Sequence, residues 1–173
     1  IDQQVFYISS STRTIDGKTI YPNNYEHSTI REWLNNDFYN QAFSTPEKDG
    51  ILTTLVDNSA STTGSPTNTN PYFSNNTLDK VYLLSYQEAI SSTYGFDTNS
   101  TRIAITTDYA RARGAYRSSL SGYYGNGYWW LRSPYFSDSI DAYCVYSDVS
   151  IYSINIVYIY SFGYGARPAI KIG

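Results

Sequence analysis

The sequence is poor in the residue types that most often build catalytic and metal centres. It contains one cysteine, Cys144, and one histidine, His27. A single cysteine permits no internal disulfide, which excludes a small secreted scaffold held together by disulfides. One histidine and one cysteine also provide no His/Cys cluster of the kind that holds zinc. We therefore expect His27 to lie on the surface near a helix start and Cys144 to be a small strand residue. We expect no catalytic residues, no metal site and no cofactor.

Charge is also scarce. Charged residues make up 16% of the chain, and the formal net charge is −3. An acidic chain has no electrostatic reason to bind nucleic acid, so we interpret the arginines of RARGAYR, from Arg111 to Arg117, as a solvated helix face. The scattered carboxylates can still meet in the fold as an acid/base pair, which keeps an enzyme among the alternatives.

The residues from Val149 to Ala166 include no charge, and this length is close to that of a membrane-spanning helix. However, Ser150, Ser153 and Asn155 interrupt the stretch, and β-branched residues dominate it. We therefore predict strands here and no membrane span. The chain also lacks methionine, and we expect it to be a processed or partial form of a longer product.

Local patterns predict a single domain of the α+β class over residues 1–173. Helices are expected mainly in the N-terminal half, with N-cap signals at Thr29 and at Ser44 or Thr45. Twisted antiparallel strands are expected mainly in the C-terminal half. Residues 57–77 consist largely of Ser, Thr, Asn, Gly and Pro, and we expect them to form an exposed polar loop or insertion.

The most informative segment runs from Tyr135 to Tyr164 and reads YFSDSIDAYCVYSDVSIYSINIVYIYSFGY. It contains no Lys, Arg, Glu, Gln, Met or Trp. An ordinary core sheet explains its Ile, Val and aromatic residues. It does not explain so many Asp and Ser residues, and it does not exclude Lys, Glu or Gln from a solvent-facing side.

A codon-level explanation accounts for the whole segment. If only the adenines of an Asn codon are replaced, the products include Tyr, Ser, Asp, Ile, Val, Phe, Cys, Ala and Gly. They never include Lys, Glu, Gln, Met or Trp. Every residue from Tyr135 to Tyr164 belongs to the accessible set, and Asn155 fits an unaltered codon. The segment therefore has the composition expected of adenine-directed mutagenesis.

The flanking sequences connect this composition to a known family. YWWLRSP precedes the segment, from Tyr128 to Pro134, and GARPAIKI follows it, from Gly165 to Ile172. With EHSTIREWLNNDFYNQAFS, DKVYLLSYQEA and ARARGAY, they resemble the variable proteins of diversity-generating retroelements. The subfamily concerned has a WWLRSP…GVRPA frame and occurs in bacteria and their phages. The resemblance covers Tyr25 to Ile172 apart from the polar loop, and it implies a C-type lectin-like fold related to formylglycine-generating enzymes.

Two activities of related proteins are not implied by the resemblance. Formylglycine-generating enzymes need paired cysteines, and this chain has only Cys144. Calcium-dependent sugar binding uses Glu-Pro-Asn and Trp-Asn-Asp motifs, whereas WLNND, from Trp33 to Asp37, matches neither.

We therefore predict a non-enzymatic binding module whose specificity is diversified while its scaffold is kept. Tyr supplies contact area with little rotamer entropy to lose, and small polar residues supply adaptable hydrogen bonds. The resemblance implies an unknown protein or glycan ligand on a cell surface, and a location on a phage tail tip or on the bacterial surface. A self-associating β-rich module and an enzyme are the alternatives, and the sequence does not determine the oligomeric state.

Burial should separate the frame from the binding residues. We expect the following frame residues to be buried: Trp129, Trp130, Leu131, Ala142, Val145, Val157 and Ala169. Arg132 and Arg167 should be structural, each held by carboxylates or backbone carbonyls, because a buried guanidinium must be paired. The expected ligand-binding residues should share one exposed face: Tyr135, Phe136, Asp138, Ile140, Asp141, Tyr143, Tyr146, Asp148, Tyr152, Ile154, Tyr158, Tyr160, Phe162 and Tyr164.

Overall fold

The computed structural model of the protein describes residues 4–148 and 154–173. Short helices and mostly antiparallel strands alternate along the chain, which confirms the predicted α+β class. The helices are α1 (Thr29–Trp33), η1 (Leu34–Phe38), α2 (Tyr39–Ala42), α3 (Thr45–Gly50), η2 (Glu88–Ile90), η3 (Ser92–Tyr94), α4 (Asn99–Arg102) and α5 (Asp108–Ala112). The strands are β1 (Arg13–Ile15), β2 (Lys18–Ile20), β3 (Thr54–Val56), β4 (Thr77–Asp79), β5 (Ala104–Ile105), β6 (Asn126–Pro134), β7 (Asp141–Val145), β8 (Ile154–Tyr158) and β9 (Tyr164–Gly165).

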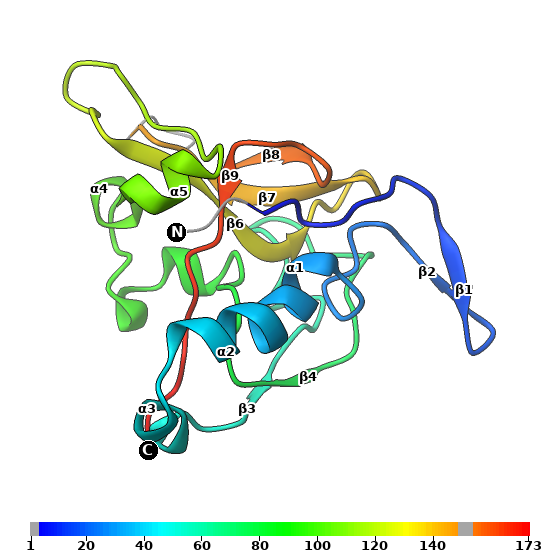
Figure 1. Ribbon diagram of the computed structural model, residues 1–173. Helices are drawn as coiled ribbons and strands as arrows, with labels where there is room; N and C mark the ends of the chain where they lie inside the picture. Colours follow the sequence, from blue (N-terminus) through cyan, green and yellow to red (C-terminus); the bar gives the residue numbers. More distant parts are fainter. Residues whose placement is uncertain (1–3, 149–153) are drawn as a thin grey trace.

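A five-stranded sheet in the second half of the chain organises the molecule (Figure 1). Its strand order is β5–β6–β7–β8, and β9 also pairs with β6. Strand β6 is the longest and pairs antiparallel with β5 and β7 and parallel with β9. The prediction that strands gather in the C-terminal half is thus correct for this sheet, while β1–β2 and β3–β4 form two separate small sheets earlier in the chain.

The first helical segment begins one residue earlier than its sequence pattern indicates. Ser28, not Thr29, is the N-cap, and its hydroxyl oxygen accepts the backbone N–H of Arg31 at 3.3 Å. The turns that follow bury Ile30 and Leu34 against the sheet, and η1 is a π-helical segment that joins α1 to α2. By contrast, α3 begins as predicted, with a capping box at Ser44.

The polar segment 57–77 is only partly exposed, so the expectation of an exposed loop is wrong for several of its residues. Asn58, Thr63 and Asn70 are buried. The amide of Asn70 donates to the carbonyl of Pro134 at the end of β6. A polar sequence can enter the interior when its polar atoms find such partners. The segment therefore packs onto the sheet instead of extending from it.

The sheet carries a hydrophobic cluster on each face. Because side chains alternate along a strand, Trp129 and Leu131 point to one face of β6 and Trp130 to the other. Trp130 packs with Phe6 and residues of α1, whereas Trp129 packs with Phe96. The burial predictions are confirmed for Trp129, Trp130, Leu131, Ala142 and Val145, while Val157 and Ala169 are half-buried.

Replacing Ser28 by Ala should destabilise the protein by about 1 kcal/mol, because it removes the N-cap acceptor. The same hydroxyl also donates to the carbonyl of Tyr25 at 2.8 Å. Thr29→Ala is the matched control and should change the free energy of unfolding little. Urea unfolding of both variants measures the difference. A larger loss in Thr29→Ala would contradict the cap position.

Candidate binding surface

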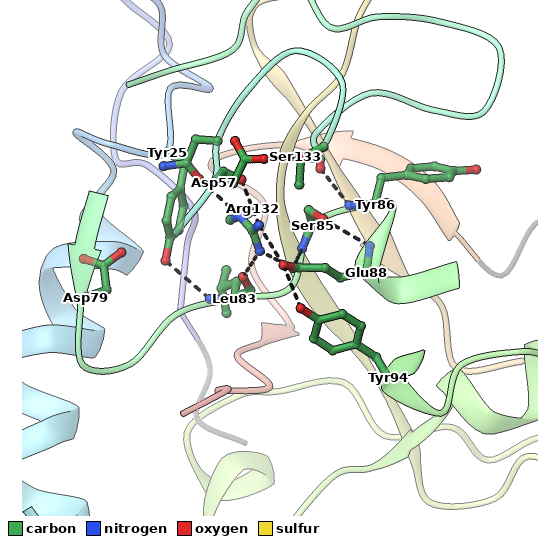
Figure 2. A network of polar contacts seen from close by, with 12 residues as sticks. Tyr25, Asp57, Asp79, Leu83, Ser85, Tyr86, Glu88, Tyr94, Arg132 and Ser133 are labelled. Atoms are coloured by element: carbon green, nitrogen blue, oxygen red, sulfur yellow. Dashed lines mark hydrogen bonds and ion pairs between the residues drawn. The ribbon is translucent and has the colours of Figure 1, made fainter. Parts of the chain in front are cut away.

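The biased segment starts directly after β6, and the guanidinium of Arg132 fixes β6 in place. This fully buried side chain donates from Nε to Asn58 Oδ1 at 3.1 Å. Its Nη1 donates to the carbonyl of Leu83 at 2.8 Å and to the Glu88 carboxylate. Its Nη2 donates to the carbonyl of Asp57 at 2.9 Å and to Glu88 at 3.0 Å (Figure 2). A guanidinium has five N–H donors, so all of them are used. The prediction that Arg132 is structural is confirmed.

Glu88 is itself held by the chain that surrounds it. Its carboxylate accepts the backbone N–H of Ser85 at 2.7 Å, and the Ser85 hydroxyl oxygen accepts the N–H of Glu88 at 3.2 Å. One residue beyond Arg132, the Ser133 hydroxyl oxygen accepts the N–H of Tyr86 at 2.8 Å (Figure 2). The segment around Ser85 is therefore tied to β6 at two successive residues.

Tyr25 extends this polar network toward α1. Its ring is fully buried, and its hydroxyl oxygen accepts the N–H of Leu83 at 3.3 Å. Burial, and next the negative charge of Asp79, raise the pKa of the Tyr25 hydroxyl far above its ordinary value. Asp79 forms an ion pair with Arg31 of α1 at 2.7 Å. Tyr25 therefore stays neutral and acts as a structural acceptor.

Arg167 is also structural, as predicted. Its guanidinium lies over the rings of Phe96 and Trp129, each at 5.0 Å from the ring centroid. Nη1 donates to the backbone carbonyl of Arg102 at 3.0 Å, and the indole of Trp129 donates to the same oxygen. The two arginines thus connect the WLRSP and GARPAI sequences to the rest of the fold.

The expectation that all diversified residues share one exposed face is wrong. Tyr143 is 6% exposed and Tyr164 is 9% exposed. Tyr143 belongs to the Trp129 cluster and makes an edge contact with Tyr86, whereas Tyr164 lies against Trp130 on the opposite face. The physical reason is that both faces of the sheet are covered where Tyr143 and Tyr164 lie, so alternation turns neither of them toward solvent.

The other predicted binding residues divide into three groups. The half-buried ones are Tyr135, Phe136, Ile140, Asp141, Tyr146 and Asp148. The exposed ones are Asp138, Tyr158, Tyr160 and Phe162. Tyr152 and the side chain of Ile154 lie outside the described part of the structure.

The exposed aromatic residues lie close together where the chain leaves β8. The rings of Tyr158 and Tyr160 stack with centroids 5.5 Å apart and an interplanar angle of 13°. Phe162 is 81% exposed and lines an open groove with Tyr160 and Ile8. We call Ile8, Tyr158, Tyr160 and Phe162 the Tyr158 surface.

The groove of the Tyr158 surface has a volume of about 560 Å³. Its other wall is the N-terminal segment, which contributes Val5, Ile8, Ser9 and Ser10. This segment is placed by the N–H of Tyr7, which donates to the carbonyl of Ile159 at 3.1 Å. Val5 and Ile8 were not predicted to line a binding surface, because no signal in their composition pairs them with residues so distant in the chain.

The outer edge of β8 is partly closed to strand addition. The N–H of Ile159 donates to the carbonyl of Ile140 at 3.1 Å, and the alternation of an antiparallel ladder then directs the N–H of Ile156 away from β7. The side chain of Asn155 accepts this N–H at 2.8 Å. The carbonyl of Tyr158 accepts the N–H of Ser161 at 2.8 Å. These contacts use groups that a second strand would need, which weighs against the self-associating alternative.

A family model described as a domain of unknown function, DUF6273, matches residues 4–173. The chain belongs to this DUF6273 family. Neither a curated protein nor a solved structure matches the chain.

The possible metal ligands and the thiol of the described part of this DUF6273 domain are arranged as follows. Within residues 4–148 and 154–173, no group of three or more His, Cys, Asp or Glu side chains is arranged to hold a metal ion. Burial raises the pKa of the Cys144 thiol well above its ordinary value, which disfavours the nucleophilic thiolate. His27 lies next to the N-cap Ser28, near Glu26 at 3.9 Å. Likewise, no helix of the described ranges has both the length and the apolar character needed to cross a membrane.

Tyr164→Ser should destabilise the domain by about 3 kcal/mol or more, because it removes a large buried ring and leaves a cavity. Tyr160→Ser, at an exposed position of the same segment, should change the free energy of unfolding by no more than about 0.5 kcal/mol. Thermal and urea unfolding of the two variants make the comparison. An equal loss of unfolding free energy in both variants would show that Tyr164 and Tyr160 do not differ in their contribution to the core.

Proposed function

We propose that this DUF6273 domain is a ligand-binding protein whose segment 135–164 is diversified by adenine-directed mutagenesis. One observation carries the proposal. Three aromatic residues of the biased segment are exposed together on the Tyr158 surface, while the frame residues Trp129, Trp130 and Arg132 are fully buried. An exposed aromatic patch is abnormal for an inert surface. Tyrosine is also among the residues that most often dominate binding energy.

The frame suits a protein that must bind different ligands over time. Arg132 and Arg167 use frame and backbone partners, so their contacts do not depend on the identity of the diversified side chains at Tyr158, Tyr160 or Phe162. Substitutions at those exposed positions alter contact area and hydrogen bonding without removing a core residue. This separation is what a diversified binding module requires.

The fold and location belong to the same proposal. Short helices around a largely antiparallel sheet, together with the WWLRSP and GARPAI sequences, support a C-type lectin-like fold. By resemblance, the ligand is a protein or glycan on a cell surface, and the domain is displayed on a phage tail tip or on the bacterial surface.

The buried tyrosines add a constraint to the proposal. Adenine-directed mutagenesis does not distinguish Tyr143 and Tyr164, which are buried, from Tyr158 and Tyr160, which are exposed. Polar replacements at the buried positions remove core contacts. Functional members of a diversified population should therefore keep large apolar or aromatic residues at positions 143 and 164, and should vary widely at 158 and 160.

The gene itself provides the test. We expect a near-copy of the 3′ coding segment beside a reverse transcriptase gene, differing from the coding sequence only where the copy has adenine. The codons of Trp129, Trp130 and Arg132 should be identical in both. Sequencing the locus, and the coding segment in several isolates, checks both expectations. Differences spread over all four bases, or over the frame codons, would contradict the proposal.

A further inference from the structure

An acidic turn borders the Tyr158 surface. Asp141 and Tyr158 are direct partners in the β7–β8 ladder, so their side chains leave the same face of the sheet as close neighbours. Asp138 is exposed and lies three residues before Asp141, and its carboxylate accepts the N–H of Ile140 at 2.8 Å. The Asp141 carboxylate therefore lies beside Tyr158, which stacks with Tyr160, and Asp138 belongs to the turn that leads into Asp141.

Hydrogen bonds from Asn23 hold the backbone of the turn that carries the carboxylates. The buried side chain of Asn23 donates from Nδ2 to the carbonyls of Asp138 and Asp141, at 2.9 and 3.0 Å. The N–H of Asn23 donates to the carbonyl of Ser139 at 3.1 Å. Because backbone groups are held by a residue outside the biased segment, this turn keeps its shape whichever side chains it presents.

Neither carboxylate of this turn, that of Asp138 or that of Asp141, has a basic partner within residues 4–148 and 154–173. Partial burial, followed by repulsion from Asp138, raises the pKa of the Asp141 carboxyl. A raised carboxyl pKa means that the charged form is disfavoured in the folded protein, so Asp141 lowers stability at pH values above that pKa. A cation from a ligand would relieve this cost.

Resting on the proposed function, we infer that the Tyr158 surface binds a basic peptide segment of a partner protein, with a Lys or Arg side chain between the Asp138–Asp141 turn and the ring of Tyr158. Tyrosine faces attract Lys and Arg cations, and carboxylates add a charge-assisted contact. The apolar groove between Tyr160 and Ile8 continues from the stacked rings and accepts an apolar neighbour of the basic residue. The net charge of −3 favours encounter with a basic partner.

A random peptide library panned against the purified domain tests this inference. Selected peptides should be enriched in Lys or Arg next to an apolar residue. Replacing that Lys by norleucine, which keeps the alkyl chain but has no ammonium group, should weaken binding about tenfold or more. Raising the salt concentration should also weaken binding, because exposed charge pairs are screened.

Matched variants locate the contact on the protein. Asp141→Asn and Tyr158→Ser should each weaken binding of the selected peptide about tenfold or more. Tyr158→Phe keeps the ring and should bind nearly as well as the original protein. Tyr109→Ser is the control, because Tyr109 is an exposed tyrosine on α5. Melting temperatures of all four variants identify any that fail to fold, and Asp138→Asn then replaces a misfolded Asp141→Asn.

Three kinds of result would contradict the inference, and each one contradicts a different part of it. Peptide binding that depends on Tyr158 but not on a Lys or Arg of the peptide or on Asp141 would confirm the binding surface and contradict its preference for cations. Peptide binding that is unaffected by Tyr158→Ser would show that the Tyr158 surface is not the binding site. Sequencing of the gene locus tests diversification separately. Preferential binding to phosphatidylcholine vesicles, or a dimer that Tyr158→Ser dissociates, would assign the surface to a lipid or to a second copy of the chain.

Discussion

The buried guanidinium of Arg132 is the constraint on which the rest of the structure depends. A buried charge is costly unless its donors are paired, and losing one partner of such a pair is strongly destabilising. The acceptors come from two separate stretches of chain, Asp57–Asn58 and the segment that contains Leu83 and Glu88. All of them must be in place at the same time. One side chain therefore sets the position of β6 against the loop before β4 and the segment that leads into η2.

The position of β6 in turn determines which residues of the biased segment are buried. Strand β7 packs between clusters on both faces of the sheet, so its side chains contribute to the core although they belong to the compositionally biased segment. Strand β8 is at the edge of the sheet, and from its last residue onward Tyr158, Tyr160 and Phe162 face solvent. Fewer residues of the segment are therefore exposed to solvent than its composition indicates.

Local chemistry predicted those parts of the fold that short-range contacts determine. The capping box at Ser44 follows from its spacing to Glu47. The structural roles of Arg132 and Arg167 follow from residue type, because a buried guanidinium must be paired, whereas their partners are distant in the sequence and were not predicted. The misses arise from distant contacts. Asn70 is buried because its partner is the carbonyl of Pro134, and no local pattern encodes a contact between residues 64 positions apart.

The dual character of the tyrosine side chain explains why buried tyrosines were predicted to be binding residues. Its ring is apolar and its hydroxyl is polar, so the same residue suits a core or a binding surface. The alternation of residues in β7 assigns Tyr143 to one face, but only the packing of Tyr86 and Tyr135 on that face decides that it is buried. Tyr158 is likewise exposed because it is the last residue of β8, and not because it is a tyrosine.

The central claim is that the Arg132 network maintains the fold independently of the exposed diversified side chains. The most direct measurement is the free energy of unfolding, in urea, of Arg132→Lys and of the triple variant Tyr158→Ser, Tyr160→Ser and Phe162→Ser. Loss of the paired guanidinium should cost about 3–5 kcal/mol, whereas three exposed substitutions should together cost no more than about 1.5 kcal/mol. A stable Arg132→Lys protein alongside an unfolded triple variant would contradict the account.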